Sequence, residues 1–308
     1  MALKDWELVI IGGGPAGLSA GIYGARARLR TLIVEKLACG GQAATTHRIE
    51  NYPGFAQGIT GPELMEQMEN QAKGLGVEFA YAEAVGLRPE SSGYVLLTDG
   101  EEIRGKTIII ATGTQPNTLG VPGEDDWRGR GVSYCATCDG AFFRDKDVVV
   151  VGGGDSAAEG ALFLTRFARK IYVVHRRDQL RATKILGERL AAHPKIQLVW
   201  NKVVKEIQGQ AFVERVLLAD TRGGEDLEIA ASGLFVYIGS NPNTEWLRTD
   251  IARTDQGYII TDERMQTSLP GVFAAGDVRR TPLRQVVTAV ADGAVAAVEA
   301  EKYLGGIL

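Results

Sequence analysis

Residues 7–17 read ELVIIGGGPAG, an apolar run that ends in a cluster of glycines. The run is typical of a buried strand, and the GxGxxG spacing is typical of the turn into a helix that binds a dinucleotide. Gly12 permits the tight turn, Gly14 lets a pyrophosphate approach the backbone, and Gly17 lets the helix pack closely on the strand. The next apolar segment ends in Glu35, whose carboxylate is placed to accept hydrogen bonds from a ribose.

The same pattern returns in residues 147–157, DVVVVGGGDSA, as a GxGxxA variant. Gly12 and Glu35 are 23 positions apart, and the same 23 positions lead from Gly152 to His175. Two glycine loops in register, each within a strand-helix-strand pattern, are far more specific than one. The sequence therefore predicts an α/β protein with two Rossmann-like nucleotide-binding domains.

The residues at the ribose position differ between the two units. The first unit has Glu35, an acid that would repel a 2′-phosphate, whereas His175 in the second is followed by Arg176, Arg177 and Arg181. The planar guanidinium binds phosphate through two hydrogen bonds. We therefore expect an NAD-like or FAD adenosine in the first unit and NADPH in the second. The alternative interpretation of the arginines is a solvated basic start of a helix.

Two similar phrases indicate how the units are connected. Residues 111–117 (ATGTQPN) and 238–243 (IGSNPN) each follow an apolar strand, and their Gly, Pro and Asn residues are typical of loops. These phrases are candidate inter-domain linkers, so the second unit is predicted to be inserted into the first. The predicted FAD-binding domain comprises residues 1–117 and 247–308, and the predicted NADPH-binding domain comprises residues 118–246.

The segment after the insertion carries a further signal. Residues 272–277 read VFAAGD, and they are followed by a long run of small residues that is predicted to be helical from about Gln285 to Leu304. Asp277 stands where an acid could bind a sugar-alcohol chain, and the helix N-terminus could face an electron-rich ring. A ligand with both features is a flavin. Alternatively, Asp277 is an ordinary cap or loop residue.

The bulk composition narrows the class of protein. The chain has 308 residues, which suits two domains, and its 45% hydrophobic and 23% charged residues are ordinary for a globular protein. A net charge of −4 argues against nucleic acid or an anionic membrane as a partner. Without a signal-peptide pattern or an apolar stretch near ~18–20 residues, the expected location is the cytoplasm.

Two of the three cysteines, Cys135 and Cys138, form a CxxC just before the second glycine loop. Two such thiols can close a small disulfide, and at the start of a helical turn one is stabilised as a thiolate with a pKa of ~3.5–7.5. Asp139 is placed to handle a proton during exchange. The alternative is half of a zinc site, but only Cys39 and three scattered histidines remain as ligands, so we expect no metal. Cys39 is expected to be a small buried hydrophobe.

Several segments together resemble the low-molecular-weight, prokaryotic-type thioredoxin reductases, over nearly the whole chain. They are GGGPAGLSA (12–20), ENYPGF (50–55), CATCDG (135–140), GGGDSA (152–157), HRRDQLRA (175–182) and AAGD (274–277). The resemblance implies an NADPH-dependent flavoenzyme that reduces the thioredoxin disulfide through FAD and a redox-active Cys135–Cys138 pair. It also implies a homodimer, and rotation of the inserted domain about linkers at residues 113–122 and 239–247.

The resemblance assigns roles to individual residues. Cys138 would face the flavin, Cys135 would attack the partner disulfide, and Asp139 would serve as the acid. The residues implied for FAD are Gly12, Gly14, Pro15, Ala16, Glu35, Gly41, Gln42, Asn51, Val85, Ala111, Thr112, Gly113, Gly276, Asp277, Arg284, Gln285 and Val286. The residues implied for NADPH are Gly154, Asp155, Ser156, His175, Arg176, Arg177 and Arg181. Val286 stands where many relatives have alanine.

Three other functions share parts of this sequence pattern. A disulfide reductase of the same fold could use another electron donor or another disulfide partner, although the arginine cluster favours NADPH. An NADP-linked flavoprotein without disulfide chemistry is disfavoured by the CATC segment. The third alternative is a nucleotide-binding redox regulator without catalytic activity, although every residue that the redox chemistry requires is present.

Overall fold

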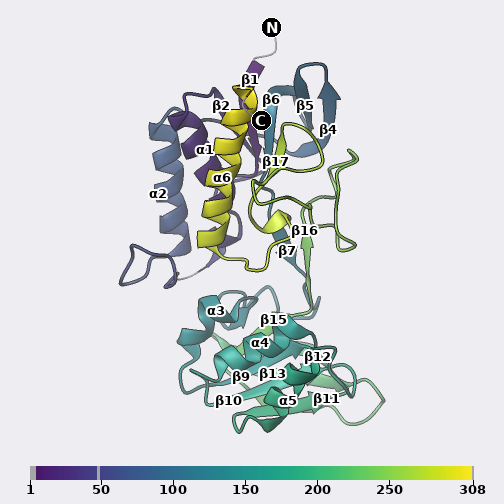
Figure 1. The fold of residues 1–308 in the computed structure, drawn as a ribbon. Helices are drawn as coiled ribbons and strands as arrows, with labels where there is room; N and C mark the ends of the chain where they lie inside the picture. The colour runs from purple at the N-terminus through teal and green to yellow at the C-terminus, as the bar shows by residue number, and fades with distance from the viewer. Residues whose placement is uncertain (1–4, 47–48, 307–308) are drawn as a thin grey trace. The chain divides into compact units, whose positions relative to one another are not determined.

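The computed structural model describes residues 5–46 and 49–306 (Figure 1). The chain forms two compact units. The first comprises residues 1–115 and 241–308, and the second comprises residues 116–240. The domain boundaries predicted from the sequence are 117/118 and 246/247.

The first unit is built on a seven-stranded sheet in the order β3-β2-β1-β6-β5-β4, with β17 also paired to β6. The strands of its parallel part are β1 (Asp5–Ile11), β2 (Thr31–Glu35), β3 (Glu78–Tyr81), β6 (Ile103–Ile110) and β17 (Val272–Ala274). β4 (Ala84–Glu90) and β5 (Gly93–Thr98) form an antiparallel extension. The first half of β6 pairs with β5 and its second half pairs with β17.

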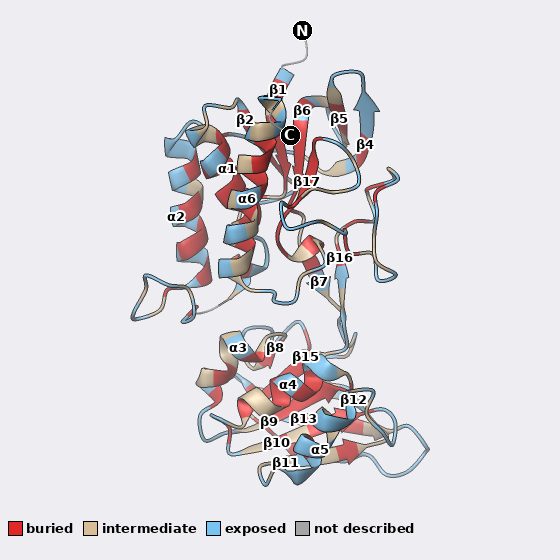
Figure 2. Ribbon diagram, in the orientation of Figure 1, coloured by how far each residue is buried: buried red, intermediate tan, exposed pale blue. Residues whose placement is uncertain are grey.

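Side chains alternate across β1 and so build two cores. Leu8 and Ile10 pack with the helices on one face, whereas Val9 and Ile11 pack on the other face with β4, β5 and the segment around Ile259. The helices are α1 (Pro15–Arg26), α2 (Gly61–Gly74) and α6 (Val286–Leu304), with short 3₁₀ turns η1 (Gly41–Thr45) and η3 (Gly276–Val278). Figure 2 shows the buried residues gathered on the strands and on the inner helix faces.

The second unit repeats this plan around a parallel sheet in the order β11-β10-β9-β15-β8. Its strands are β8 (Val132–Ser133), β9 (Asp147–Gly152), β10 (Lys170–His175), β11 (Ile196–Trp200) and β15 (Gly233–Tyr237). One face packs on α3 (Ala136–Asp139), η2 (Gly140–Phe143), α4 (Asp155–Leu164) and α5 (Lys184–Ala192). The other packs on an antiparallel sheet of β12 (Lys202–Gly209), β13 (Val213–Asp220) and β14 (Leu227–Ala230).

The two units share their strand register. Leu8 of β1 lies opposite Thr31 of β2, and Val148 of β9 lies opposite Ile171 of β10. Both pairs join residues 23 positions apart (8 with 31, and 148 with 171), the spacing that the sequence predicted. The predicted fold class, two Rossmann-like α/β domains with the second inserted into the first, is confirmed.

The two predicted linkers run together where the chain passes between the units. β7 (Thr114–Pro116) pairs with β16 (Ser240–Pro242), and the Asn117 N–H donates to the carbonyl of Gly239. Across residues 5–46 and 49–306, none of the helices combines the length and the apolar character needed to cross a membrane.

Candidate functional site

The first glycine loop has the geometry of a phosphate-binding turn. Gly12 has a φ of +106°, and a Cβ there would lie 2.4 Å from the carbonyl oxygen of Ala111. A Cβ on Gly17 would lie 1.8 Å from the Gly12 carbonyl oxygen, so helix and strand are in close contact at this point. A Cβ on Gly14, in contrast, would meet no protein atom within 4 Å. Protein atoms therefore pack tightly against Gly12 and Gly17, whereas the space beside Gly14, at the N-terminus of α1, is not filled by any described residue.

Glu35 binds the glycine loop directly. Its Oε2 accepts a hydrogen bond of 2.8 Å from the Gly13 N–H, and its Oε1 accepts one of 3.2 Å from the Leu37 N–H. Each carboxylate oxygen retains capacity for a further donor, such as a ribose hydroxyl. Cys39 packs beside the same loop, since a Cβ on Gly13 would lie 2.7 Å from its Sγ. Burial raises the pKa of the Cys39 thiol to about 12, which keeps it protonated.

The segment after Cys39 reaches the same loop. The Gly40 N–H donates to the Gly13 carbonyl at 2.8 Å, and a Cβ on Gly41 would lie 3.6 Å from the Cα of Gly14. The Gln42 side chain donates to the carbonyl of Thr114, at 2.5 Å. These contacts place the predicted residue Gly41 beside Gly14 and connect the predicted residue Gln42 to Thr114.

The predicted C-terminal residues also gather at α1. Gly276 has a φ of +75°, and a Cβ on it would lie 2.9 Å from the Cβ of Ala16. Burial raises the pKa of the neighbouring Asp277 to about 6, against the opposing effect of the Arg284 guanidinium. The Arg284 guanidinium itself lies over the ring of Tyr258, 4.5 Å from its centroid.

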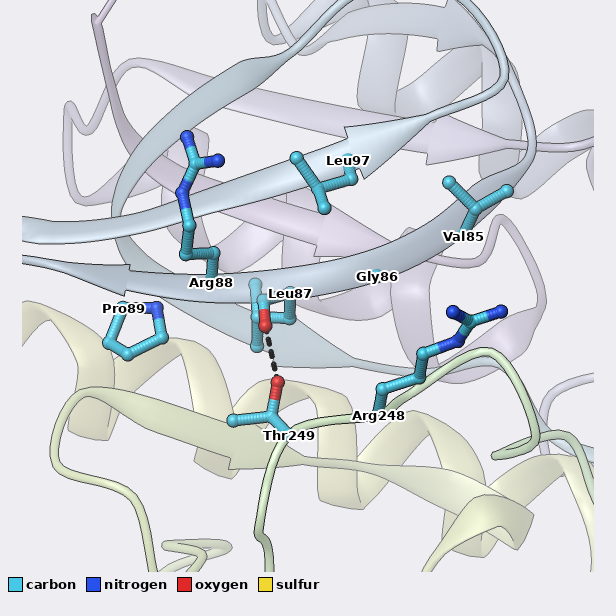
Figure 3. A pocket seen from close by; sticks show the side chains of 8 residues that line it. All are labelled: Val85, Gly86, Leu87, Arg88, Pro89, Leu97, Arg248 and Thr249. Carbon is cyan, nitrogen blue, oxygen red and sulfur yellow. Dashed lines mark hydrogen bonds between the residues drawn. The ribbon is translucent and has the colours of Figure 1, made fainter.

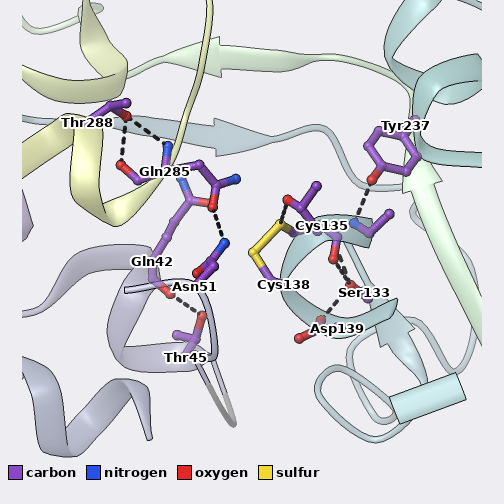
Figure 4. Close-up of a disulfide and its surroundings, with 12 residues drawn as sticks. Gln42, Thr45, Asn51, Ser133, Cys135, Cys138, Asp139, Tyr237, Gln285 and Thr288 are labelled. Carbon is purple, nitrogen blue, oxygen red and sulfur yellow. Dashed lines mark hydrogen bonds between the residues drawn. A yellow bond between two sulfur atoms is a disulfide. The ribbon is translucent and has the colours of Figure 1, made fainter. Parts of the chain in front are cut away.

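Gln285 connects the start of α6 to the segment around Asn51. The Asn51 side-chain amide donates to Gln285 Oε1 at 2.8 Å (Figure 4). Gln285 is also the N-cap of α6, in a capping box with Thr288, and Val286 is the first helical residue. Residues 111–113 are held by the segment that follows β16, because Thr112 and Asn243 exchange two hydrogen bonds of 2.8 Å.

This arrangement fits FAD in its main features. Among the residues that the structure describes, no side chain caps the N-terminus of α1, so its N–H groups are available to a pyrophosphate, and Gly14 leaves the space in front of them open. Val85 is 43% exposed on β4 and lines a shallow hollow of about 450 Å³ with Arg88, Arg248 and Thr249 (Figure 3). The hydroxyl of Thr249 donates to the Leu87 carbonyl there.

The second glycine loop repeats the geometry of the first. A Cβ on Gly152 would lie 2.4 Å from the carbonyl oxygen of Tyr237, whereas a Cβ on Gly154, the N-cap of α4, would meet no atom within 4 Å. The segment that carries Arg181 is bound to this loop. The Arg181 N–H donates to the Gly153 carbonyl at 2.6 Å, and the Thr183 N–H donates to Asp155 Oδ1 at 2.7 Å.

His175 lies under this loop and not on its surface. It is 6% exposed, and a Cβ on Gly153 would lie 2.2 Å from its Cε1. Burial, with the charges of Arg181 and Arg176, lowers the pKa of its imidazole, so the ring is neutral near pH 7. Its Nε2 has no hydrogen-bond partner among the described residues. The imidazole ring thus packs against the second glycine loop at Gly153, on the buried side of the loop.

The three arginines fit a 2′-phosphate. Arg176, Arg177 and Arg181 are all exposed, and within the described parts of the chain none of their guanidinium groups is in an ion pair. They flank a loop whose helix, α4, has no side-chain cap from any described residue. Free guanidinium groups beside an open helix N-terminus are the donors that an adenosine 2′-phosphate and a diphosphate require.

The CxxC closes a disulfide in the second unit. The Cα atoms of Cys135 and Cys138 are 5.3 Å apart, and Cys135 is the N-cap of the short helix α3. The Thr137 hydroxyl lies 3.3 Å from Cys135 Sγ. Among the described residues there is no group of three or more His, Cys, Asp or Glu side chains that could hold a metal ion.

Two residues that the sequence analysis did not single out bind the disulfide segment (Figure 4). The Ser133 hydroxyl accepts from the Cys135 N–H at 3.1 Å and lies 2.6 Å from Asp139 Oδ2. The Tyr237 hydroxyl accepts from the Ala136 N–H at 2.6 Å, and burial raises the pKa of this phenol to about 12. Ser133 is close in sequence and could have been suspected, whereas nothing local connects Tyr237 with the disulfide.

Known proteins share both the sequence and the fold. Residues 6–293 match the family described as pyridine nucleotide-disulphide oxidoreductase. The chain is 47% identical over 305 residues to the thioredoxin reductase of Peptoclostridium acidaminophilum, covering 97% of each chain. It is 46% identical to that of Bacillus subtilis, covering 98% of this chain and 95% of the relative. The crystal structure of thioredoxin reductase from Streptococcus pyogenes matches with a TM-score of 0.91 and 48% identity, covering 98% and 99% of the two chains.

Two dinucleotide-binding folds joined to a redox-active disulfide define a flavin- and nicotinamide-dependent disulfide oxidoreductase, and this class implies FAD and NADPH as cofactors. The chain belongs to the pyridine nucleotide-disulphide oxidoreductase family and, within it, to the thioredoxin reductases. The resemblance deduced from the sequence is confirmed.

Proposed function

We propose that this chain reduces the disulfide of a thioredoxin with electrons from NADPH. In the net reaction NADPH, one proton and the thioredoxin disulfide become NADP⁺ and the thioredoxin dithiol. The observation that carries the proposal is the Cys135–Cys138 disulfide at the start of α3, in the same unit as the arginine-flanked glycine loop. One domain thus carries both the dithiol and the predicted nicotinamide site.

The first unit would hold FAD. The N-terminus of α1 with Gly14 would bind the pyrophosphate, Glu35 would accept from the adenosine ribose, and Asp277 would bind the ribityl chain. Once bound, the flavin supplies two-electron chemistry between a nicotinamide and a disulfide. Asp277 suits a hydroxyl-rich ligand because a half-buried carboxyl with a raised pKa can accept hydrogen bonds when ionised and donate one when protonated.

The second unit would hold NADPH. Gly154 and Ser156, at the N-terminus of α4, would bind the diphosphate, and Arg176, Arg177 and Arg181 would bind the 2′-phosphate. Asp155 would position the segment after Arg181, because its carboxylate accepts a hydrogen bond from the Thr183 N–H. His175 would support Gly153 from below.

The dithiol would transfer electrons by thiol–disulfide exchange. The Cys135 thiolate, stabilised by the Thr137 hydroxyl, attacks one sulfur of the partner disulfide and forms a mixed disulfide. The other partner sulfur leaves as a thiolate and takes a proton from Asp139. Cys138 then attacks Cys135 Sγ, which re-forms the intramolecular disulfide and releases the second partner sulfur. The partner gains the two electrons that the Cys135–Cys138 dithiol loses.

Rotation of the second unit is part of the proposal. A flavin held by the first unit must exchange electrons with a nicotinamide and a dithiol that both belong to the second. The connections at residues 113–122 and 239–247 would allow the second unit to rotate, so that the nicotinamide and the dithiol reach the flavin one after the other. The alternative function is the same disulfide chemistry with another electron donor or another disulfide partner.

A coupled assay tests the proposal. The wild-type chain, loaded with FAD, should oxidise NADPH when oxidised thioredoxin is added, and much more slowly with NADH. Cys135→Ser and Cys138→Ser should each abolish thioredoxin reduction, whereas Ser232→Ala, in the same unit, should keep full activity. Absence of NADPH oxidation by the wild-type chain would refute the enzymatic function. Oxidation of another donor, or reduction of another disulfide protein alone, would favour the alternative.

The proposal also includes a homodimer in the cytoplasm. The resemblance implies the dimer, and the single cysteine outside the CxxC suits a reducing compartment. Sedimentation equilibrium of the FAD-loaded chain and fractionation of its native cells test these two points separately.

A further inference from the structure

Ser133 is a buried residue that joins the backbone of Cys135 to the carboxylate of Asp139 (Figure 4). Its side chain is 5% exposed. Its hydroxyl accepts a hydrogen bond of 3.1 Å from the Cys135 N–H and lies 2.6 Å from Asp139 Oδ2. Strand β8 holds Ser133 in register with Phe235 of β15. The sheet therefore fixes the Ser133 backbone independently of the disulfide.

The Ser133 hydroxyl has one proton and two acceptors within reach. Asp139 Oδ2 lies at 2.6 Å and the Cys135 carbonyl oxygen lies at 3.4 Å. A hydroxyl can donate one hydrogen bond and accept two. When Asp139 is ionised, the short, charge-assisted bond to Oδ2 is the stronger of the two. The carbonyl then remains as a second acceptor for the same proton.

We propose that Ser133 is a positioning residue that holds Asp139 in place for proton transfer in both of its protonation states. This inference rests on the proposed function. With Asp139 ionised, Ser133 donates to Oδ2. With Asp139 protonated, Oδ2–H donates to Ser133 Oγ, and the serine proton turns to the Cys135 carbonyl. In both states the Cys135 N–H still donates to Ser133, and no heavy atom has to move.

The proton balance of one cycle follows from this arrangement. The Oδ2–H of protonated Asp139 turns away from Ser133 Oγ and gives its proton to the thiolate that leaves the partner disulfide, and Asp139 becomes a carboxylate. The Ser133 proton then turns from the Cys135 carbonyl to Oδ2. The carboxylate later takes a proton from water, and the serine proton turns back. Hydroxyl rotation thus replaces the reorganisation that an acid without a fixed partner would need.

Tyr237 of β15 is a titratable residue close enough for the charge of Asp139 to contribute to the raised pKa of its phenol. Burial raises the pKa of Tyr237 to about 12, and its hydroxyl is bound to the Ala136 N–H. The Tyr237 phenol is therefore neutral near pH 7, and its hydrogen bond with the Ala136 N–H fixes its position. The other titratable groups of this segment are the two thiols of the reduced dithiol, Cys138 within α3 and Cys135 at its N-cap.

The leaving thiolate of the substrate provides the test. A basic aliphatic thiolate, as in 2-hydroxyethyl disulfide, needs a proton to leave, whereas the weakly basic nitrothiobenzoate of 5,5′-dithiobis(2-nitrobenzoate) leaves without one. The FAD-loaded full chain, reduced with dithiothreitol and freed of excess reductant, is mixed with each disulfide in a stopped-flow instrument. The variants are Ser133→Ala, Ser133→Thr and Asp139→Asn, with Ser232→Ala as the matched control.

Ser133→Ala should slow exchange with 2-hydroxyethyl disulfide by about tenfold, while exchange with the nitrobenzoate disulfide stays within about twofold. Asp139→Asn should show the same selectivity, and Ser133→Thr, which retains the hydroxyl, should restore the rate. Equal losses with both disulfides would show a merely structural role and overturn the proposal. So would an unchanged Ser133→Ala rate or the absence of selectivity in Asp139→Asn. Failure of the wild-type chain to reduce thioredoxin concerns the proposed function alone, because these exchange rates need neither thioredoxin nor NADPH.

Discussion

The carboxylate of Glu124 accepts a hydrogen bond of 2.8 Å from the phenol of Tyr134, the residue immediately before Cys135. The same carboxylate accepts from the N–H groups of Leu119 and Gly120, at 2.9 and 2.8 Å. Glu124 is 3% exposed, and the Arg128 guanidinium lies over the Tyr134 ring. One buried carboxylate thus fixes both the connection into the second unit and the segment that leads to the disulfide.

Glu124→Ala should destabilise the chain strongly, because it leaves two part-buried N–H groups and a phenol without their acceptor. We expect a loss of about 3 kcal/mol in the free energy of unfolding, against about 1 kcal/mol for Tyr134→Phe, which removes one bond. Urea denaturation measures both values. If Glu124→Ala lowers the free energy of unfolding no more than Tyr134→Phe does, the hydrogen bonds from the two backbone N–H groups contribute little.

Tyr237→Phe should destabilise the second unit without disturbing its packing. The ring is fixed, since a Cβ on Gly160 would lie 2.8 Å from it, but the Ala136 N–H would lose its acceptor. We expect a loss of about 1–3 kcal/mol in the free energy of unfolding. Tyr23→Phe, at a ring that is 44% exposed, is the matched control and should change little. Equal effects of the two substitutions would contradict the role given to the Tyr237 hydroxyl.

Much of the fold and part of the site could be predicted because they depend on local patterns. The glycine spacing and the apolar run at residues 7–17 specify a strand, a turn and a helix together, and the 23-residue offset follows from the parallel register of β1 with β2. The contact of Tyr237 with Ala136 spans 101 residues of sequence, so no local pattern could have indicated it. It results from the order of strands in the second sheet.

His175 shows where a correct pattern leaves the local structure undetermined. Its position in the repeat was predicted, but a residue at the end of a strand can face the ligand or the core. The missing side chain of Gly153 allows the imidazole to lie beneath the loop. Ser133 is a similar case, because its burial and its hydrogen bonds with Cys135 and Asp139 depend on the fold and not on a local sequence pattern.

The stability of the chain without FAD should fall as the pH rises from about 4 to about 6. The pKa of Asp277 is raised to about 6 in the folded chain, so the folded state binds a proton that the unfolded state has already lost. Ionising this half-buried carboxyl therefore costs stability above the folded pKa, by about 3 kcal/mol, and costs nothing below the unfolded pKa. Asp277→Asn should remove this loss and be more stable than the wild type at pH 7, while it weakens FAD binding. Thermal unfolding between pH 4 and 8 measures the effect, and parallel curves for the two chains would contradict it.

Removing two of the free arginines should change nicotinamide specificity. Arg177→Ala with Arg181→Ala should raise the KM for NADPH by about ten- to a hundredfold, since each bidentate phosphate contact is charge-assisted. The KM for NADH, which lacks the 2′-phosphate, should change little. Arg189→Ala, at an exposed arginine of α5, is the matched control. A parallel rise for both nucleotides would indicate that the arginines support the fold and do not read the phosphate.

Gly14→Ala should separate cofactor binding from folding. The φ of Gly14 is −77°, which alanine adopts freely, and the added Cβ would meet no protein atom within 4 Å. The free energy of unfolding without FAD should therefore stay within about 0.5 kcal/mol of the wild type. FAD affinity should fall at least about tenfold, because the methyl group occupies the space that the pyrophosphate needs. Gly17→Ala is the contrasting variant, since its Cβ would lie 1.8 Å from the Gly12 carbonyl oxygen and should prevent folding. Unimpaired FAD binding by Gly14→Ala, measured by flavin fluorescence titration, would show that the pyrophosphate binds away from this loop.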